Sequence, residues 1–277
     1  MNLPYQYTSL ARIIDPRIRT NLLILIITTL SGVIAGALNL ALTSNFGDAI
    51  ARGFWTGAAV MIAWVITREA DPDHENAALA VAVFTAVLAL WSTSTLRLTP
   101  LVALIVAARI VNRIVGPPAK ITDSAVLLGI SLFAALTGDA VAATIALFAY
   151  LLDAGLLQPQ QWQLGFAAAG LGVLLLAWNQ PRLVYSGVDG VQWLIIVVCV
   201  AAYFLVAMTT ERCVTPCDVV GYRLDVGRVR AAMLLVVLTG VAGVAWYGGV
   251  ALYALLPVWT TMIGIAAYRV YLRVMPG

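Results

Sequence analysis

The sequence predicts an all-α protein, a polytopic bundle of about ten transmembrane helices. Hydrophobic residues make up 62% of the 277 residues and charged residues only 10%, and the mean hydropathy is +0.96. A soluble domain carries about 25% charged residues, so most of this surface must face lipid. The apolar runs are continuous, whereas the strands of a membrane barrel alternate apolar and polar residues. Helices are therefore favoured over a closed barrel.

Stretches without charged residues define the expected helices. The first eight are 20–47, 53–67, 76–96, 98–108 continuing past Arg109 to Val115, 124–138, 140–152, 154–181 and 190–210. The last apolar run follows them. Asp139 interrupts the middle of this series. We therefore expect three helices between 124 and 181 rather than the alternative of two.

The last apolar run, 231–268, contains no charged residue. One straight helix of that length would reach roughly 57 Å, whereas the hydrocarbon core of a bilayer is about 30 Å thick. Near its centre, WYGGV at 246–250 combines aromatic residues that prefer the membrane interface with two glycines that break helices. We therefore expect a hairpin of two helices here, which brings the total to ten.

Basic residues sort to one side of this predicted bundle. If the N-terminus is cytoplasmic, the outer loops hold only Arg52, Arg97 and Arg182. The cytoplasmic side holds Arg12, Arg17, Arg19, Arg68, Arg109, Arg113, Lys120, Arg212, Arg223, Arg228, Arg230, Arg269 and Arg273. Cytoplasmic loops of membrane proteins are enriched in arginine and lysine. We therefore predict cytoplasmic N- and C-termini, in a multi-pass protein of the cell (inner or plasma) membrane.

The predicted domain organisation follows from this topology. It is a cytoplasmic N-terminal segment, 1–19, and a single transmembrane helical domain, 20–273, with cytoplasmic loops near 68–75, 113–123 and 211–230. Small residues are expected to let helices approach closely, at Gly32 and Gly36 in the first helix and at Gly165 and Gly170 in the seventh.

The most polar stretch of the chain is TREADPDHENAA, residues 67–78, which also contains the only histidine. A structural interpretation places Asp71 at a helix N-cap, Pro72 at the first helical position and Asp73 in the first turn. A functional interpretation makes Asp71, Asp73 and Glu75 the hard oxygen ligands of a divalent cation, with Mg²⁺ as the candidate cofactor. The two interpretations are compatible.

A second polar cluster ends the fourth expected helix. Arg109, Asn112 and Arg113 are spaced i, i+3 and i+4, so they share one helix face. A guanidinium at this depth must snorkel, pair with an acid or hold an anion such as phosphate. Together with Arg228 of the 211–230 loop, these residues form a candidate phosphate site.

Other cofactors and partners are disfavoured by composition. Cys213 and Cys217 form C-x₃-C, but a zinc site needs two further ligands, and Cys199 lies in an apolar run. The chain has no paired histidines for haem and no late lysine for a retinal Schiff base. A net charge of +3 does not indicate a nucleic-acid partner. Membrane lipids are the expected partners, and the sequence does not predict an oligomeric state.

These one-sided polar clusters predict an intramembrane enzyme that acts on a lipid (prenyl or acyl) phosphate at the cytoplasmic face. The acidic loop after the second helix resembles that of the UbiA-type intramembrane prenyltransferases. Their motif has aspartates at four-residue spacing, whereas this loop reads Glu69, Asp71, Asp73, Glu75. Their second aspartate-rich loop follows the sixth helix, where this chain has only Asp153 followed by QPQQ.

Two alternatives come from other classes of protein. Ten short helices with both ends inside resemble the outline of the drug/metabolite transporters, which implies a small-solute transporter. Few polar residues are expected at mid-membrane to form its substrate site. The third interpretation is a non-catalytic subunit of a membrane assembly.

Overall fold

A computed structural model describes residues 8–12, 14–92, 95–181, 185–219 and 221–275. The protein is all-α, with eleven helices in the part of the chain that is described. They are α2 (Arg19–Thr43), α3 (Phe46–Ala70), α4 (Glu75–Trp91), α5 (Leu98–Asn112), α6 (Ile121–Leu136), α7 (Val141–Gly155), α8 (Gln163–Trp178), α9 (Gly190–Thr209), α10 (Val226–Tyr247), α11 (Ala251–Ala254) and α12 (Leu256–Val274).

Four helices, α2, α3, α9 and α10, are long and apolar enough to cross a membrane. Another five, α4 to α8, are equally apolar in character but have only 15 to 17 residues. A 15-residue helix rises about 22 Å, which is shorter than the hydrocarbon core. The predicted all-α class is confirmed, and four helices of membrane-spanning length and composition indicate a membrane protein.

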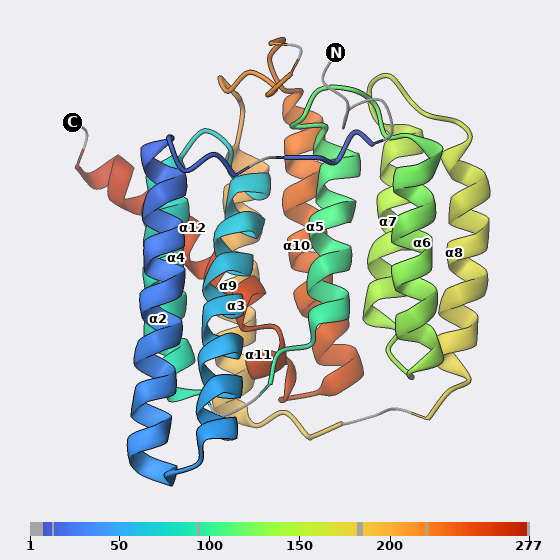
Figure 1. Ribbon diagram of the computed structural model, residues 1–277. Helices are drawn as coiled ribbons and strands as arrows, with labels where there is room; N and C mark the ends of the chain where they lie inside the picture. The colour runs from blue at the N-terminus through green and yellow to red at the C-terminus, as the bar shows by residue number, and fades with distance from the viewer. Residues whose placement is uncertain (1–7, 13, 93–94, 182–184, 220, 276–277) are drawn as a thin grey trace.

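Successive helices run in opposite directions, so their connections gather at two ends of the bundle (Figure 1). The described ends of the chain lie at the end drawn at the top, together with the loops 71–74, 113–120, 156–162 and 210–225. We call this the polar end. Segments far apart in the sequence therefore meet there.

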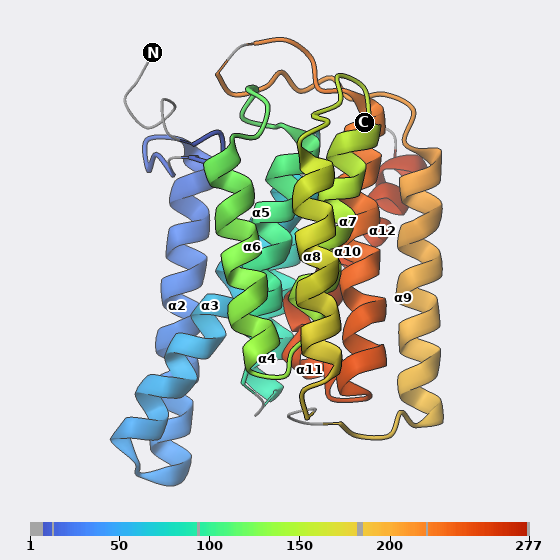
Figure 2. The same ribbon diagram turned by 90° about the vertical axis from the view of Figure 1, so that its right-hand side faces the viewer.

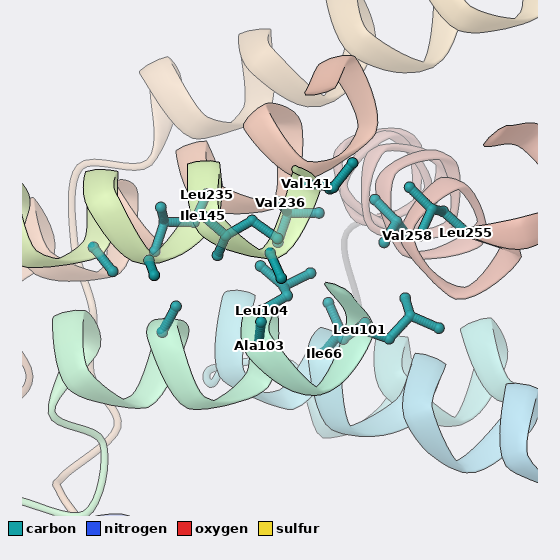
Figure 3. Packing of buried hydrophobic residues seen from close by; sticks show 14 of the residues in the cluster. Ile66, Leu101, Ala103, Leu104, Val141, Ile145, Leu235, Val236, Leu255 and Val258 are labelled. Carbon is teal, nitrogen blue, oxygen red and sulfur yellow. The ribbon is translucent and has the colours of Figure 1, made fainter. Parts of the chain in front are cut away.

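The core lies around α5, which packs against α3, α6, α7 and α10. Figure 3 shows part of this apolar packing. Leu101 and Leu104 of α5 are fully buried, as is Ile145 of α7, and they pack with Leu235 of α10 in one cluster. By contrast, α2 and α9 lie at opposite edges of the bundle (Figure 2). Their outward faces are apolar and exposed, as expected for helices that face lipid.

The expected three helices between 124 and 181 and the expected final hairpin are confirmed. The chain breaks at Gly248, whose φ of 66° lies in the left-handed region. A Cβ on Gly248 would also collide with the carbonyl oxygen of Ser186. Glycine is required there both by its backbone conformation and by this close approach.

Close helix contacts occur at some of the predicted glycines. A Cβ on Gly32 would lie 2.9 Å from the carbonyl oxygen of Gly53, and one on Gly36 would lie 3.0 Å from that of Ala49. These glycines therefore let α2 lie against α3, as predicted. In the seventh expected helix, Gly170 faces the backbone of Leu147 of α7.

The prediction for Gly165 is wrong. Among the described residues, no atom lies within 4 Å of a Cβ built at this position. The sequence spacing marks small residues on the helix but does not identify which of them faces a neighbour.

The predicted helix start at Asp71 is also wrong. Helix α3 continues to Ala70, Asp71 is its C-cap, and α4 begins only at Glu75. The Asp71 carboxylate instead accepts bonds from Arg269 of α12 and lies 2.9 Å from His74 Nδ1, so it does not cap the next helix.

Candidate functional site

The polar end contains four carboxylates that are almost completely buried. Glu69, Asp71, Asp123 and Asp153 are each at most 2% exposed. A buried charge is tolerated only when it is paired and hydrogen-bonded. The partners of each carboxylate therefore determine what this end of the bundle can do.

Glu69 of α3 pairs with residues from α5 and from the N-terminal segment. Its Oε1 accepts from Arg109 Nε at 2.9 Å and lies 3.6 Å from Arg12 Nη1. Its Oε2 accepts from Asn112 Nδ2 at 3.1 Å. Arg109 also donates to the carbonyl of Leu10 at 2.9 Å. One carboxylate thus joins α3, α5 and the N-terminal segment.

The N-terminal segment is held across the polar end by further contacts (Figure 1). Ser9 donates its hydroxyl to Asp123 at 2.6 Å and its backbone N–H at 3.0 Å. Arg12 pairs with Asp218 at 3.0 Å. The segment therefore connects the start of α6 with the loop that precedes α10.

Asp71 pairs with the only histidine and with the last helix. His74 Nδ1 lies 2.9 Å from Asp71 Oδ1, and Arg269 Nη2 donates to the same oxygen at 2.9 Å. The ring of Tyr268 meets that of His74 edge to face at 5.9 Å. These contacts join the α3–α4 connection to α12.

Asp73 anchors the loop before α10. It accepts bonds from the hydroxyl of Thr215 at 2.5 Å, from the backbone N–H groups of Val214 and Thr215, and from the thiol of Cys213 at 3.3 Å. Burial acts to raise the pKa of Asp73, but these hydrogen bonds outweigh it, so its pKa lies below the usual value. Asp73 is therefore ionised at neutral pH and holds this loop.

The three predicted metal ligands, Asp71, Asp73 and Glu75, are not brought together. Glu75 pairs with Arg68 at 3.1 Å, so each of the three has its own partners. Within the described ranges, no group of three or more His, Cys, Asp or Glu side chains could hold a metal ion. The carboxylates of residues 67–78 thus make separate contacts to four other segments. These are the N-terminal segment, α5, the loop before α10 and α12.

The four predicted phosphate ligands fall into two groups. Arg109 and Asn112 share Glu69, as their spacing suggested. Arg113, however, is the C-cap of α5 with a φ of 53°, in the left-handed region. This conformation turns its side chain away from the shared face, and it meets Arg228 instead.

Arg113 and Arg228 both donate to Asp153 Oδ1, each at 2.8 Å. Gln163 donates to Asp153 Oδ2 at 3.2 Å and accepts from Ser124 at 2.9 Å. We call the set Arg113, Asp153, Gln163 and Arg228 the Asp153 cluster. All four residues are buried, and they join α5, α7, α8 and α10.

A pocket of about 390 Å³ opens beside Glu69 and the start of α2. Its polar lining includes Arg12, Arg68 and Arg109, and its apolar lining includes Ile18 and Trp64. We call it the rim pocket. It is amphipathic and lies at the polar end, next to the exposed apolar surface of α2.

Two residues that line the rim pocket each have a buried N–H group with no acceptor among the described residues. Trp64 is 7% exposed, and its indole Nε1 has no hydrogen-bond partner in the described part of the chain. The same holds for Nη1 of Arg68, whose Nη2 pairs with Glu75. A buried donor without an acceptor costs about 1–3 kcal/mol. These two unpaired N–H groups belong to residues that line the pocket, so an acceptor bound there could satisfy them after a small movement of the side chains.

Sequence reasoning missed Glu69, Asp153 and Trp64 as members of these sites. Asp153 carried one signal, because it is a single acid close to an apolar helix and must find a cation if it is buried. Trp64 carried none, since a tryptophan in an apolar helix is expected to pack. Glu69 was indistinguishable from the other acids around it.

We expect Cys213 to resist alkylation. Burial and the neighbouring Asp73 carboxylate raise the pKa of its thiol to about 12, so little thiolate forms at pH 8.5. In a background with Cys199→Ser and Cys217→Ser, iodoacetamide should label native Cys213 at least tenfold more slowly than the unfolded protein. Asp73→Asn should accelerate the labelling of Cys213 in the folded protein. Equal labelling rates with and without the Asp73 substitution would contradict the role of Asp73 as the anchor of this loop.

Comparisons with known proteins assign no family to this geometry. No family model, no curated protein and no solved structure matches the chain. The function is therefore inferred from the residues of the polar end.

Proposed function

We propose that this protein binds the phosphate head of a prenyl or acyl lipid in the rim pocket and acts on it as an enzyme. In this proposal the chain crosses the cell membrane ten times, and the polar end with both termini faces the cytoplasm. The main support is that two residues lining this amphipathic pocket, Trp64 and Arg68, each have a buried N–H group without an acceptor among the described residues.

The distribution of basic residues supports the proposed topology. Thirteen of the sixteen arginine and lysine residues belong to segments of the polar end, and such residues collect in cytoplasmic loops. The described ends of the chain both lie at that end of the bundle (Figure 1). Anionic headgroups of the inner leaflet would then lie level with the rim pocket.

The chemistry of the pocket suits a phosphate ester with an apolar tail. A phosphate supplies several strong acceptors for Arg68, Arg109 and the indole of Trp64. The Arg68–Glu75 pair can open, because Glu75 is 51% exposed and its carboxylate can turn to water. The apolar lining would take the first carbons of the tail, and the remainder would extend into lipid.

Asp218 is the carboxyl group of this pocket that is best placed for proton transfer. Burial raises the pKa of Asp218 above its usual value, although Arg12 acts in the opposite direction. A carboxyl group whose pKa is shifted towards neutrality can exchange a proton during phosphate-ester chemistry. We therefore propose Asp218 as the acid–base group of the reaction.

Binding is tested on the full-length protein in detergent with farnesyl phosphate, dodecyl phosphate and the corresponding alcohols. We expect the phosphates to bind at least tenfold more tightly than the alcohols. Arg68→Gln should weaken phosphate binding about 10- to 100-fold, the usual effect of losing a charged hydrogen bond. Arg19→Gln, which removes an exposed arginine at the start of α2, is the matched control. Equal affinity for phosphates and alcohols would refute the proposal.

Turnover is measured separately, as release of inorganic phosphate from the same lipid phosphates. Asp218→Asn should reduce the turnover rate at least 100-fold and leave lipid affinity within a factor of three. Lipid binding without turnover in the native protein would exclude hydrolysis of these lipids and leave a binding or transport role.

Trp64→Phe should affect stability and binding in opposite directions. Because the indole N–H has no acceptor, its removal should leave the unliganded protein equally stable or more stable by up to about 1 kcal/mol. Phosphate binding should weaken about fivefold, since one donor is lost. Trp91→Phe, at a residue that is 84% exposed, is the control. A destabilised Trp64→Phe protein with unchanged lipid affinity would contradict the assignment.

A further inference from the structure

The Asp153 cluster contains more positive than negative charge. Arg113 and Arg228 are 4% and 3% exposed, and they share one fully buried carboxylate. Gln163 completes the cluster but is uncharged. The cluster therefore has an excess of one positive charge among side chains that are almost completely buried.

Arg228 has acceptors for most of its N–H groups. It donates to Asp153 and to the carbonyl groups of Val111, Leu157 and Gln158. Val111 lies in the last turn of α5, and the other two carbonyls follow the end of α7, where backbone oxygens carry partial negative charge. These acceptors stabilise the positively charged guanidinium of Arg228.

Arg113 is different, because only one of its nitrogens has acceptors. Nη2 donates to Asp153 and to the carbonyl of Gln158. Nε and Nη1 are buried and have no partner among the described residues. A guanidinium has five N–H groups, so three of them lack an acceptor here. The excess charge and the missing acceptors therefore belong to the same side chain.

We propose that Arg113 binds a small monovalent anion of the halide class, buried beside the Asp153 cluster. One such anion cancels the excess charge and accepts the free N–H groups. A water molecule would satisfy donors but leave the charge uncompensated. The proposal is independent of the proposed function, because none of the residues of the Asp153 cluster lines the rim pocket.

The loop before α10 would enclose the anion. Asp218 and Val219 donate their backbone N–H groups to the carbonyls of Ile114 and Val115 at 2.9 and 3.1 Å. The hydroxyl of Tyr222 donates to the carbonyl of Gly116. These contacts cover the segment that carries Arg113, so the bound ion is expected to exchange slowly.

The test compares thermal unfolding of the detergent-solubilised protein in sodium chloride and in sodium gluconate at equal ionic strength. Gluconate is a much larger anion than chloride and serves as the comparison. A ligand that binds only the folded state raises the Tm with its concentration. We expect chloride to raise the Tm by about 5 °C over a hundredfold range of concentration. Arg113→Gln should abolish this shift, whereas Arg223→Gln, an exposed arginine of the neighbouring loop, should retain it.

Three results would overturn the proposal: a Tm that is equal in chloride and gluconate, a chloride shift that persists in Arg113→Gln, or stabilisation by phosphate alone. If Arg113→Gln does not fold, the proposal is tested on crystals of the native protein in which bromide replaces chloride. An anomalous scattering peak within about 3.5 Å of the Arg113 guanidinium supports the site, and bromide-loaded crystals without that peak refute it.

Discussion

Asp153→Asn is expected to destabilise the protein by about 3–5 kcal/mol, the usual effect of removing one partner from a buried ion pair. The substitution preserves the size of the side chain but leaves Arg113 and Arg228 facing each other in the bundle, without their shared carboxylate. Neither arginine can turn to water, because both are nearly completely buried. The free energy of unfolding in mixed micelles of increasing SDS content measures the loss.

A double variant separates the charge effect from a general loss of packing. If two unpaired arginines cause the instability, Asp153→Asn combined with Arg113→Gln should recover at least about 1 kcal/mol of it, as coupled neighbours do. Asp48→Asn, at an exposed aspartate of α3, is the matched control and should change stability by less than about 1 kcal/mol. A double variant less stable than Asp153→Asn would argue against the electrostatic account.

Gly53→Val should have the second largest effect, because it forces α2 away from α3. A Cβ on Gly53 would lie 2.7 Å from the carbonyl oxygen of Gly32, a backbone atom that cannot move aside. The side chain therefore separates the helices, and α2 has few other buried residues to hold it in place. We expect a loss of about 3 kcal/mol, at the upper end of the range for overpacked positions.

The chain contains a matched control for this substitution. Gly172 of α8 is also a helical glycine, but none of the described atoms lies within 4 Å of a Cβ built on it. Gly172→Val should leave the unfolding free energy within about 0.5 kcal/mol of the native value. A similar loss in the two variants would show that the glycine backbone, and not the close approach of α2 and α3, sets stability.

Most of the helical architecture could be predicted because the signals are local. Apolar runs between charged residues mark each helix, and the glycines at 248 and 249 mark the final break. Boundaries were less accurate. Helix α3 extends far beyond the charge-free window of 53–67 that predicted it. The helix also includes the charged residues Asp48 and Arg52 near its start and Arg68 near its end. A charged residue ends a charge-free run without ending a helix.

The candidate site could be predicted only in part, because pairing depends on distant segments. The spacing of Arg109 and Asn112 correctly placed them together. Nothing in the sequence shows that Glu69 is their partner, or that Arg113 adopts a left-handed conformation and joins Asp153. Acids that are neighbours in the sequence do not form one site. Asp71 binds Arg269 of α12, whereas Asp73 binds the loop before α10.

The hydrogen bonds from Ser9 to Asp123 imply an order of events during biosynthesis. These two residues are 114 positions apart, so the ribosome must synthesise the entire intervening stretch before they can meet. Leu10 and Arg12 can meet Arg109 and Glu69 earlier, but the bonds of Ser9 must wait for Asp123. Full protection of this segment against proteases should therefore begin only once Asp123 has left the exit tunnel.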